Sequence, residues 1–335
     1  KNKLDSMLVT DLKNVFYYSG YKGTSAYLII GLDFLYLITD FRYITQAKMQ
    51  CSHYEIIDVK NADLKGMTAN LKRTGFENLS ISYASFAKFS KIFNKLVCVG
   101  GAIYNFRAKK SASEIKNTKK AVDIADKAFE HIIKFAKPGM TEIDAANEID
   151  FFMKRNGASG NSFDTICASG ARGALPHGTP TSKKLEYGDL VVLDYGCVYN
   201  GYCSDITRTF AVGEISAEAK RVYDTVLTAQ KTAEDMLKSG EMCCNAHFTA
   251  ENIINKDYEG TFGHALGHGV GLDIHEQPTL SPKNKTILKP GNIVTVEPGI
   301  YIPNFCGVRI EDMVCIKKNG VEILTKAEKD LKHIG

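Results

Sequence analysis

The sequence predicts a two-domain α/β protein: a small α/β domain at the amino-terminal end, then a larger domain with helices and antiparallel strands. Three observations lead to this prediction. The chain has 335 residues, enough for roughly two domains. Strand-like runs alternate with polar and helical stretches up to residue 100, and long helical patterns begin near residue 111. An Asn200-Gly201 pair between two runs of β-branched and aromatic residues marks an antiparallel hairpin.

Composition and charge exclude several classes of protein. Hydrophobic residues make up 44% of the chain, which provides ample core, but no apolar run approaches the roughly 20 residues that span a bilayer. The net charge is only +4 and the basic residues are scattered, which argues against nucleic-acid binding. The nine cysteines are odd in number and show no C-x-x-C spacing, which favours free thiols. With no signal-peptide pattern at the start, we expect a reducing, cytoplasmic location.

The first domain is predicted from alternating short elements. Strands are expected at residues 7–10, 27–30, 34–39, 55–59, 79–82 and 96–99, and helices near residues 42–51 and 86–96. A basic segment follows, and the first long helical pattern begins after it. We therefore place the domain boundary between residues 107 and 112, which gives domains of residues 1–108 and 109–335.

Helix-capping patterns open the second domain. Ser111 and Glu114 have the spacing of a capping box at the start of a long helix, which Pro138 ends. Thr141 then caps a second helix that has acidic residues in its first turn. A third helix is expected at about residues 217–239.

The hairpin turn at Asn200-Gly201 brings two carboxylates together. A two-residue type I′ turn there places Asp194 opposite Thr207, so Asp194 and Asp205 become diagonal neighbours on one face, with Cβ atoms about 7–8 Å apart or less. That separation suits two carboxylates that bind a pair of metal ions about 3.5–4 Å apart. A solvated face of an antiparallel hairpin would contain the same acids, so the hairpin alone leaves both interpretations open.

Further candidate ligands lie downstream. Residues 263–276 contain His264, His268 and His275 among four glycines, and histidine is the commonest metal ligand near neutral pH. Glu297 ends an apolar strand pattern, and Glu311 is predicted within a strand, where an acid is costly to bury unless it is paired or metal-bound. Alternatively, Glu297 could be a turn-edge carboxylate, and Glu311 could pair with Arg309 or face solvent.

Five short segments contain these residues, except His264, together with His177. They are Leu175-Pro176-His177-Gly178, Asp194-Tyr195-Gly196, residues 204–209, residues 267–276, and residues 297–301 with 308–312. In order and spacing they resemble the metallopeptidases that include aminopeptidase P, prolidase and methionine aminopeptidase. Residues 10–20 and 39–43 also resemble the amino-terminal domain of the aminopeptidase P and prolidase branch.

This resemblance implies a creatinase-like amino-terminal domain and a pita-bread catalytic domain with a curved antiparallel sheet. It also implies two divalent metal ions, Mn²⁺ being a natural candidate for oxygen-rich ligands, with Co²⁺ or Zn²⁺ as alternatives. The implied metal ligands are Asp194, Asp205, His268, Glu297 and Glu311. The residues implied to act on the substrate are His177, His264, His275, Glu297 and Arg309.

The function expected from the resemblance is that of a cytoplasmic Xaa-Pro aminopeptidase acting on proline-containing peptides. A dipeptidase restricted to Xaa-Pro is the nearest alternative, and a non-catalytic binding protein with the same fold is a remote one. The family also implies a homodimer. Neither a nucleic acid nor a membrane is expected as a partner.

Overall fold

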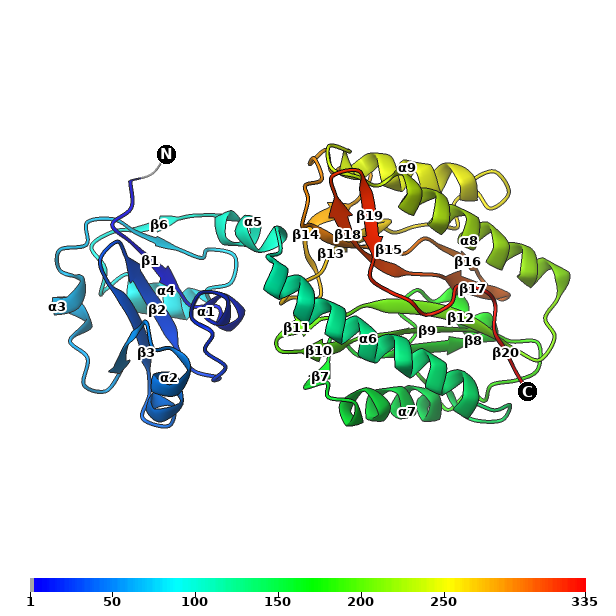
Figure 1. The fold of residues 1–335 in the computed structure, drawn as a ribbon, viewed down its shortest axis with the longest axis horizontal. Coiled ribbons are helices and arrows are strands. Elements are labelled where there is room, and N and C mark those ends of the chain that lie inside the picture. The colour runs from blue at the N-terminus through cyan, green and yellow to red at the C-terminus, as the bar shows by residue number, and fades with distance from the viewer. Residues whose placement is uncertain (1–2) are drawn as a thin grey trace. The chain divides into compact units, whose positions relative to one another are not determined.

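The computed structural model describes residues 3–335. The chain folds into two compact units, Lys1–Phe106 and Arg107–Gly335, whose elements are labelled in Figure 1. The predicted boundary, after residue 108, lies two residues later, at the end of helix α5 (Ala102–Ala108). Each unit is described separately below.

The first unit is a mixed sheet covered by helices on both faces. The strands follow the order β4-β3-β2-β1-β5-β6. Their bounds are β1 (Ser6–Val9), β2 (Tyr27–Gly31), β3 (Leu35–Thr39), β4 (Glu55–Asp58), β5 (Thr74–Phe76) and β6 (Leu96–Cys98). The helices are α1 (Leu12–Ser19), α2 (Ile44–Gln50), α3 (Leu64–Thr68), α4 (Tyr83–Phe89) and α5 (Ala102–Ala108), the last of which crosses the boundary. Leu8 and Val9, neighbours in β1, belong to different hydrophobic clusters because successive side chains point to opposite faces.

Most of the elements predicted here are confirmed within a few residues, but helices α1, α3 and α5 were not predicted, and three further points differ. The predicted strand at residues 79–82 is wrong, since these residues form a turn in which Ser82 caps α4 by accepting a hydrogen bond from the Ser85 amide. The strand of this region is β5 instead, whose central glycine gives little strand signal. The predicted helix at residues 86–96 begins at Tyr83 and ends at Phe89.

The second unit contains two pairs of helices and several sheets whose strands are mostly antiparallel, with β12 and β20 paired in parallel. The helices are α6 (Ala112–Phe135), α7 (Glu142–Arg155), α8 (Ala217–Met236) and α9 (Cys243–Ile254), with a 3₁₀ helix η1 at Gly170–Ala174. The strands up to the second helix pair are β7 (Gly160–Asn161), β8 (Ile166–Ser169), β9 (Leu190–Tyr195), β10 (Cys197–Tyr199), β11 (Tyr202–Cys203) and β12 (Ile206–Val212). Those after it are β13 (Gly267–Gly269), β14 (Glu276–Leu280), β15 (Ile293–Val296), β16 (Gly299–Ile302), β17 (Cys306–Arg309), β18 (Asp312–Lys317), β19 (Gly320–Ile323) and β20 (His333–Ile334).

The local signals of the second unit are confirmed. Ser111 and Thr141 both form complete capping boxes at the starts of α6 and α7. The hairpin has the predicted register, with Thr207 paired with Asp194. Asn200 and Gly201 both have positive φ, 48° and 85°, as a type I′ turn requires. Helix α9 was not predicted, because Met242 at its N-cap position offers no side-chain acceptor.

Each helix pair covers one sheet. Helices α6 and α7 pack on the sheet of order β20-β12-β9-β8, and α8 and α9 pack on the sheet of order β14-β13-β15-β18-β19. Figure 1 shows the strands between the two helix pairs. The sheets meet where the Glu311 amide donates a 3.0 Å hydrogen bond to the Thr207 carbonyl. Within residues 3–335, no helix has the length and apolar character that a membrane crossing needs.

Candidate functional site

A cavity of about 540 Å³ lies in the second unit and is lined by every residue that the sequence analysis assigned to the site. These residues are His177, Asp194, Asp205, His264, His268, His275, Glu297, Arg309 and Glu311. Apolar side chains, including those of Phe163, Ile166 and Ile274, form another part of the lining. The cavity thus combines charged groups with an apolar wall, as substrate sites commonly do.

The acidic residues come from the two sheets that meet at β12 and β18. Asp194 lies in β9 and Asp205 immediately precedes β12, so the hairpin brings this pair to the cavity. Glu297 follows β15, as predicted. Glu311 was expected within a strand, but it lies in the break between β17 and β18. This break lets the Glu311 backbone bond to β12 instead of to its own sheet.

Asp205, His268 and Glu311 offer one atom each within 4.8 Å of one another. The side chains are deeply buried, with Asp205 5% and Glu311 1% exposed. Burial, followed by the charge of Asp194, raises the pKa of Asp205 well above its usual range, and burial with the charge of Asp205 does the same to the pKa of Glu311. Within residues 3–335, Asp194 Oδ1 and Glu311 Oε1 are buried without a hydrogen-bond partner. Cations are needed to compensate the negative charges of buried carboxylates that lie so close together. The carboxylate oxygens and the histidine nitrogen of this cluster fit divalent metal ions.

His268 is oriented as a metal-binding histidine would be. Its Nδ1 lies 3.1 Å from the Gly269 carbonyl, so Nδ1–H donates there and Nε2 faces the carboxylates. Nε2 lies 3.3 Å from Glu297 Oε1 and 3.5 Å from Asp205 Oδ2. Burial lowers the pKa of His268, but the hydrogen bond and charge of Glu297 and the charge of Asp205 outweigh it and raise the pKa to about 9. A cation between these groups would replace that proton.

Arg309 binds Asp194 and not Glu311, so the Arg309–Glu311 ion pair considered from the sequence does not form. Its Nη2 donates to Asp194 Oδ2 at 2.6 Å, and its Nε donates to Thr207 Oγ1 at 3.1 Å. Thr207 in turn donates to Glu311 Oε2 at 2.8 Å. Thr207 therefore connects the Glu311 carboxylate to Arg309, which in turn binds the Asp194 carboxylate. The sequence did not indicate this role for Thr207 beyond its pairing with Asp194.

Tyr301 is a further residue that sequence reasoning missed. Its hydroxyl lies 2.7 Å from Arg309 Nη1 and 3.0 Å from His264 Nε2. Because an arginine side chain can only donate hydrogen bonds, the Tyr301 oxygen accepts the bond from Arg309 Nη1. The Tyr301 hydroxyl can then donate its own hydrogen bond to His264 Nε2. His264 Nδ1 lies 2.8 Å from the Ala265 carbonyl, which makes Nδ1 the protonated nitrogen. Burial lowers the pKa of His264, in agreement with this neutral tautomer.

His177 and His275 are exposed and line the cavity. The ring of His275 lies 4.3 Å from that of His268, between centroids. Burial of part of the ring, followed by the charge of His268, lowers the pKa of His275, which favours its neutral form. Both histidines can therefore reach a molecule in the cavity.

Fold and site together define a protein with a carboxylate-rich candidate metal centre at the junction of two sheets. Residues 116–318 match the family model described as metallopeptidase family M24, and residues 1–109 match the creatinase/prolidase N-terminal domain. The chain belongs to metallopeptidase family M24 and is a peptidase. The predicted family and fold class, with a creatinase-like first domain and a pita-bread second domain, are confirmed. Members of this family depend on two metal ions.

Similar proteins cover almost the whole chain. An Xaa-Pro dipeptidase from Pyrococcus horikoshii is 39% identical over 339 residues, which cover 99% of this chain and 95% of that protein. The structure of an Xaa-Pro dipeptidase from Bacillus anthracis has a TM-score of 0.95 and 41% identity, with 99% and 95% of the two chains covered. An X-Pro aminopeptidase from Thermotoga maritima MSB8 has a TM-score of 0.92 and 36% identity, with 99% and 98% covered.

Proposed function

We propose that this protein is a two-metal exopeptidase that hydrolyses the bond between an amino-terminal residue and proline. The observation that carries the proposal is the buried, charge-rich cluster in which two carboxylate oxygens lack a partner within residues 3–335. The residues that would hold the two ions are Asp194, Asp205, His268, Glu297 and Glu311. Ions bound there would polarise the scissile carbonyl and lower the pKa of the attacking water.

The protein's own groups would bind the substrate and move protons. Burial raises the pKa of Glu297, but the hydrogen bond and charge of His268 outweigh it and lower the pKa to about 2. Glu297 is therefore ionised at neutral pH, and its carboxylate can take a proton from water and pass it to the leaving nitrogen. His177 and His275 are placed to donate hydrogen bonds to the substrate carbonyl or to the negative charge that develops on it. Arg309 and His264 would keep Asp194 and the cavity wall in place.

Specificity for proline is consistent with this arrangement. An Xaa-Pro bond is a tertiary amide without an N–H group, so its recognition cannot use that donor. The leaving group is the proline nitrogen, which needs a proton when the bond breaks. The apolar wall of the cavity offers a surface against which a pyrrolidine ring could pack.

A dipeptidase restricted to Xaa-Pro is the second candidate. The names of two relatives favour it, since the proteins from Pyrococcus horikoshii and Bacillus anthracis are both called Xaa-Pro dipeptidases. The relative from Thermotoga maritima MSB8, which is called an X-Pro aminopeptidase, favours the first candidate. A non-catalytic binding protein is disfavoured, because the family is one of peptidases.

Hydrolysis of Ala-Pro and Ala-Pro-Ala by metal-stripped protein, with and without Mn²⁺, tests both candidates. We expect Mn²⁺-dependent release of alanine from the tripeptide. Cleavage of the dipeptide alone would identify a dipeptidase, and cleavage of neither with any divalent ion would contradict the Xaa-Pro assignment. Asp205→Asn should abolish turnover while the circular dichroism spectrum stays unchanged. Unchanged turnover in this variant would overturn the assignment of the metal ligands.

Three further expectations belong to this proposal: Mn²⁺ as the working ion, a homodimer, and a cytoplasmic location. The carboxylate-rich ligand set supports Mn²⁺, and family resemblance supports the dimer. All nine cysteines are free thiols, and only Cys98 is exposed, which supports a reducing compartment. Sedimentation equilibrium and metal analysis of protein purified without added metal would test the first two.

A further inference from the structure

Arg208 is a fully buried cation directly behind the proposed metal centre. Only 1% of the residue is exposed. Its guanidinium group has five N–H donors, and all five have acceptors. Nε donates to Glu328 O at 3.2 Å, Nη1 to Thr207 O at 2.9 Å and Glu311 O at 2.5 Å, and Nη2 to Asp312 Oδ1 at 2.6 Å and Ala327 O at 2.7 Å. The hydrogen-bonding capacity of this side chain is therefore saturated.

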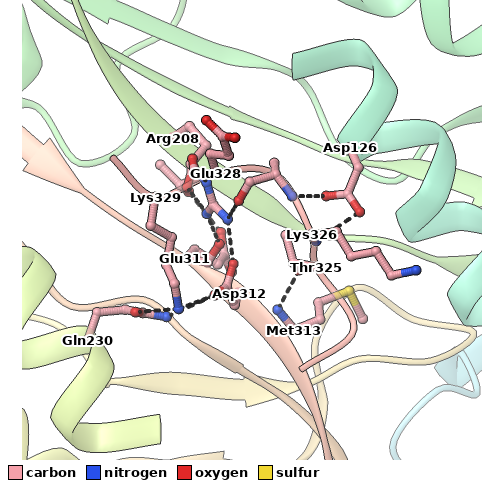
Figure 2. A network of polar contacts seen from close by, with 12 residues as sticks. Asp126, Arg208, Gln230, Glu311, Asp312, Met313, Thr325, Lys326, Glu328 and Lys329 are labelled. Atoms are coloured by element: carbon pink, nitrogen blue, oxygen red, sulfur yellow. Dashed lines mark hydrogen bonds and ion pairs between the residues drawn. The ribbon is translucent and has the colours of Figure 1, made fainter. Parts of the chain in front are cut away.

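The five acceptors come from three separate pieces of chain. Thr207 belongs to β12, Glu311 and Asp312 lie where β18 begins, and the other two acceptors lie in the C-terminal segment, residues 325–330. Figure 2 shows Arg208 between these pieces, with dashed lines to its partners. Since β12 and β18 belong to different sheets, one side chain holds the two sheets and the C-terminal segment together.

The same junction delivers two of the proposed metal ligands. Asp205 immediately precedes β12, and Glu311 immediately precedes β18. Side chains alternate along a strand, so Thr207 and Arg208 point to opposite faces of β12, where Thr207 binds the Glu311 carboxylate and Arg208 binds the Glu311 carbonyl. Glu311 is therefore held from both sides of β12.

The C-terminal segment is itself anchored by other elements. Asp126 of α6 accepts hydrogen bonds from the amides of Lys326 and Ala327, both at 2.9 Å. The Tyr223 hydroxyl of α8 donates to the Lys329 carbonyl at 2.8 Å. Arg208 thus connects the ligand-bearing strands to a segment that is fixed to both helix pairs, which gives it a rigid support (Figure 2).

We propose that Arg208 is a positioning residue that holds Glu311 at the distance from Asp205 that the metal ions require. This inference rests on the proposed function. Arginine is needed because only a planar group with five donors can reach all three pieces of chain, whereas a lysine has three donors on one atom. A purely structural ion pair would instead contribute to folding alone, since buried pairs can often be replaced without loss of function.

The test is Mn²⁺ affinity, measured by titration calorimetry on metal-stripped protein. Arg208→Lys should bind Mn²⁺ about 10–100-fold more weakly than the parent, the usual loss when a group that supports a metal ligand is removed. The control variant is Ile132→Ala, which opens a cavity in the core beneath α6 and should bind Mn²⁺ as tightly as the parent.

Amide hydrogen exchange in the metal-free protein provides a readout that depends on neither ions nor substrate. The Glu311 amide, which donates to Thr207, should exchange faster in Arg208→Lys but not in Ile132→Ala. If Arg208→Lys does not fold, Asp312→Asn keeps an acceptor for Nη2 but removes its charge, and a smaller loss of affinity in the same direction is expected.

Unchanged affinity and exchange in a folded Arg208→Lys or Asp312→Asn protein would overturn the inference, as would an equal loss of affinity in Ile132→Ala at matched stability. These results leave the proposed function intact if the parent binds Mn²⁺. If the parent itself binds no divalent ion, the proposed function fails together with the inference.

Discussion

Tyr301 is the residue through which two candidate catalytic groups contact each other. Its hydroxyl accepts from Arg309 and donates to His264. Tyr301→Phe would leave both partners buried without this hydrogen bond, which typically costs ~1–3 kcal/mol. We therefore expect kcat/KM to fall about tenfold or more, with a changed pH profile because His264 Nε2 loses its hydrogen-bond donor.

The matched control for Tyr301→Phe is Tyr223→Phe, which also removes a buried hydroxyl. The Tyr223 hydroxyl donates to the Lys329 carbonyl and does not line the cavity. This variant should lose some thermal stability and keep the pH profile of the parent. Steady-state kinetics of both variants across a pH series provide the measurement. Parent-like kinetics of Tyr301→Phe would show that the hydrogen bonds to Arg309 and His264 do not matter for turnover.

The loop between β13 and β14, which leads to His275, is anchored by a buried ion cluster. Lys110 Nζ lies 2.9 Å from Glu276 Oε2, and Arg107 pairs with both Asp273 and Glu276. Side-chain exposure is 1% for Lys110, 2% for Arg107 and 3% for Glu276. Lys110→Met would leave Glu276 with one cation fewer in the interior. Breaking a buried pair in this way typically costs about 3–5 kcal/mol.

Urea denaturation of Lys110→Met should therefore show a large loss in the free energy of unfolding. The control is Lys127→Met, which removes an ion pair with Asp123 on the exposed face of α6. Exposed pairs contribute about 0–1 kcal/mol, so this variant should remain close to the parent. A loss of the same small size in both variants would mean that the Glu276 cluster does not anchor the loop.

The elements that could be predicted from the sequence are those specified by adjacent residues. The Asn200-Gly201 turn determined the pairing of Asp194 with Thr207, and the Ser111 capping box identified the start of α6. Elements without such signals were missed, such as α9. The family motifs identified the residues that line the cavity, but Tyr301 could not be singled out, because its two partners come from other strands and loops. Long-range contacts of this kind have no local pattern.

At the scale of the whole molecule, the C-terminal segment closes a buried network that makes stability depend on pH. Lys329 Nζ lies 2.7 Å from both Glu234 Oε2 and Asp312 Oδ2, and 3.0 Å from Gln230 Oε1 (Figure 2 shows Lys329 with Asp312 and Gln230). Two carboxylates thus share one lysine in the interior. Burial, followed by the charge of Asp312, raises the pKa of Glu234 to about 7, although Lys329 opposes this shift.

This raised pKa determines the sign of the pH effect. The folded protein holds the Glu234 proton to higher pH than the unfolded chain, whose glutamates titrate near about 4.3. The stabilisation from this group is thus fully present below that value and is lost as the pH rises through about 7.

Glu234→Gln is neutral at every pH, so the unfolding free energy of the parent relative to this variant should fall, on the order of 1 kcal/mol, between about pH 5.5 and about pH 8. Urea denaturation at both values measures this, and Glu218→Gln, on the exposed face of the same helix, should show no such change. A difference between parent and Glu234→Gln that stays constant with pH would mean that Glu234 keeps its charge, with Lys329 satisfying both acids at once.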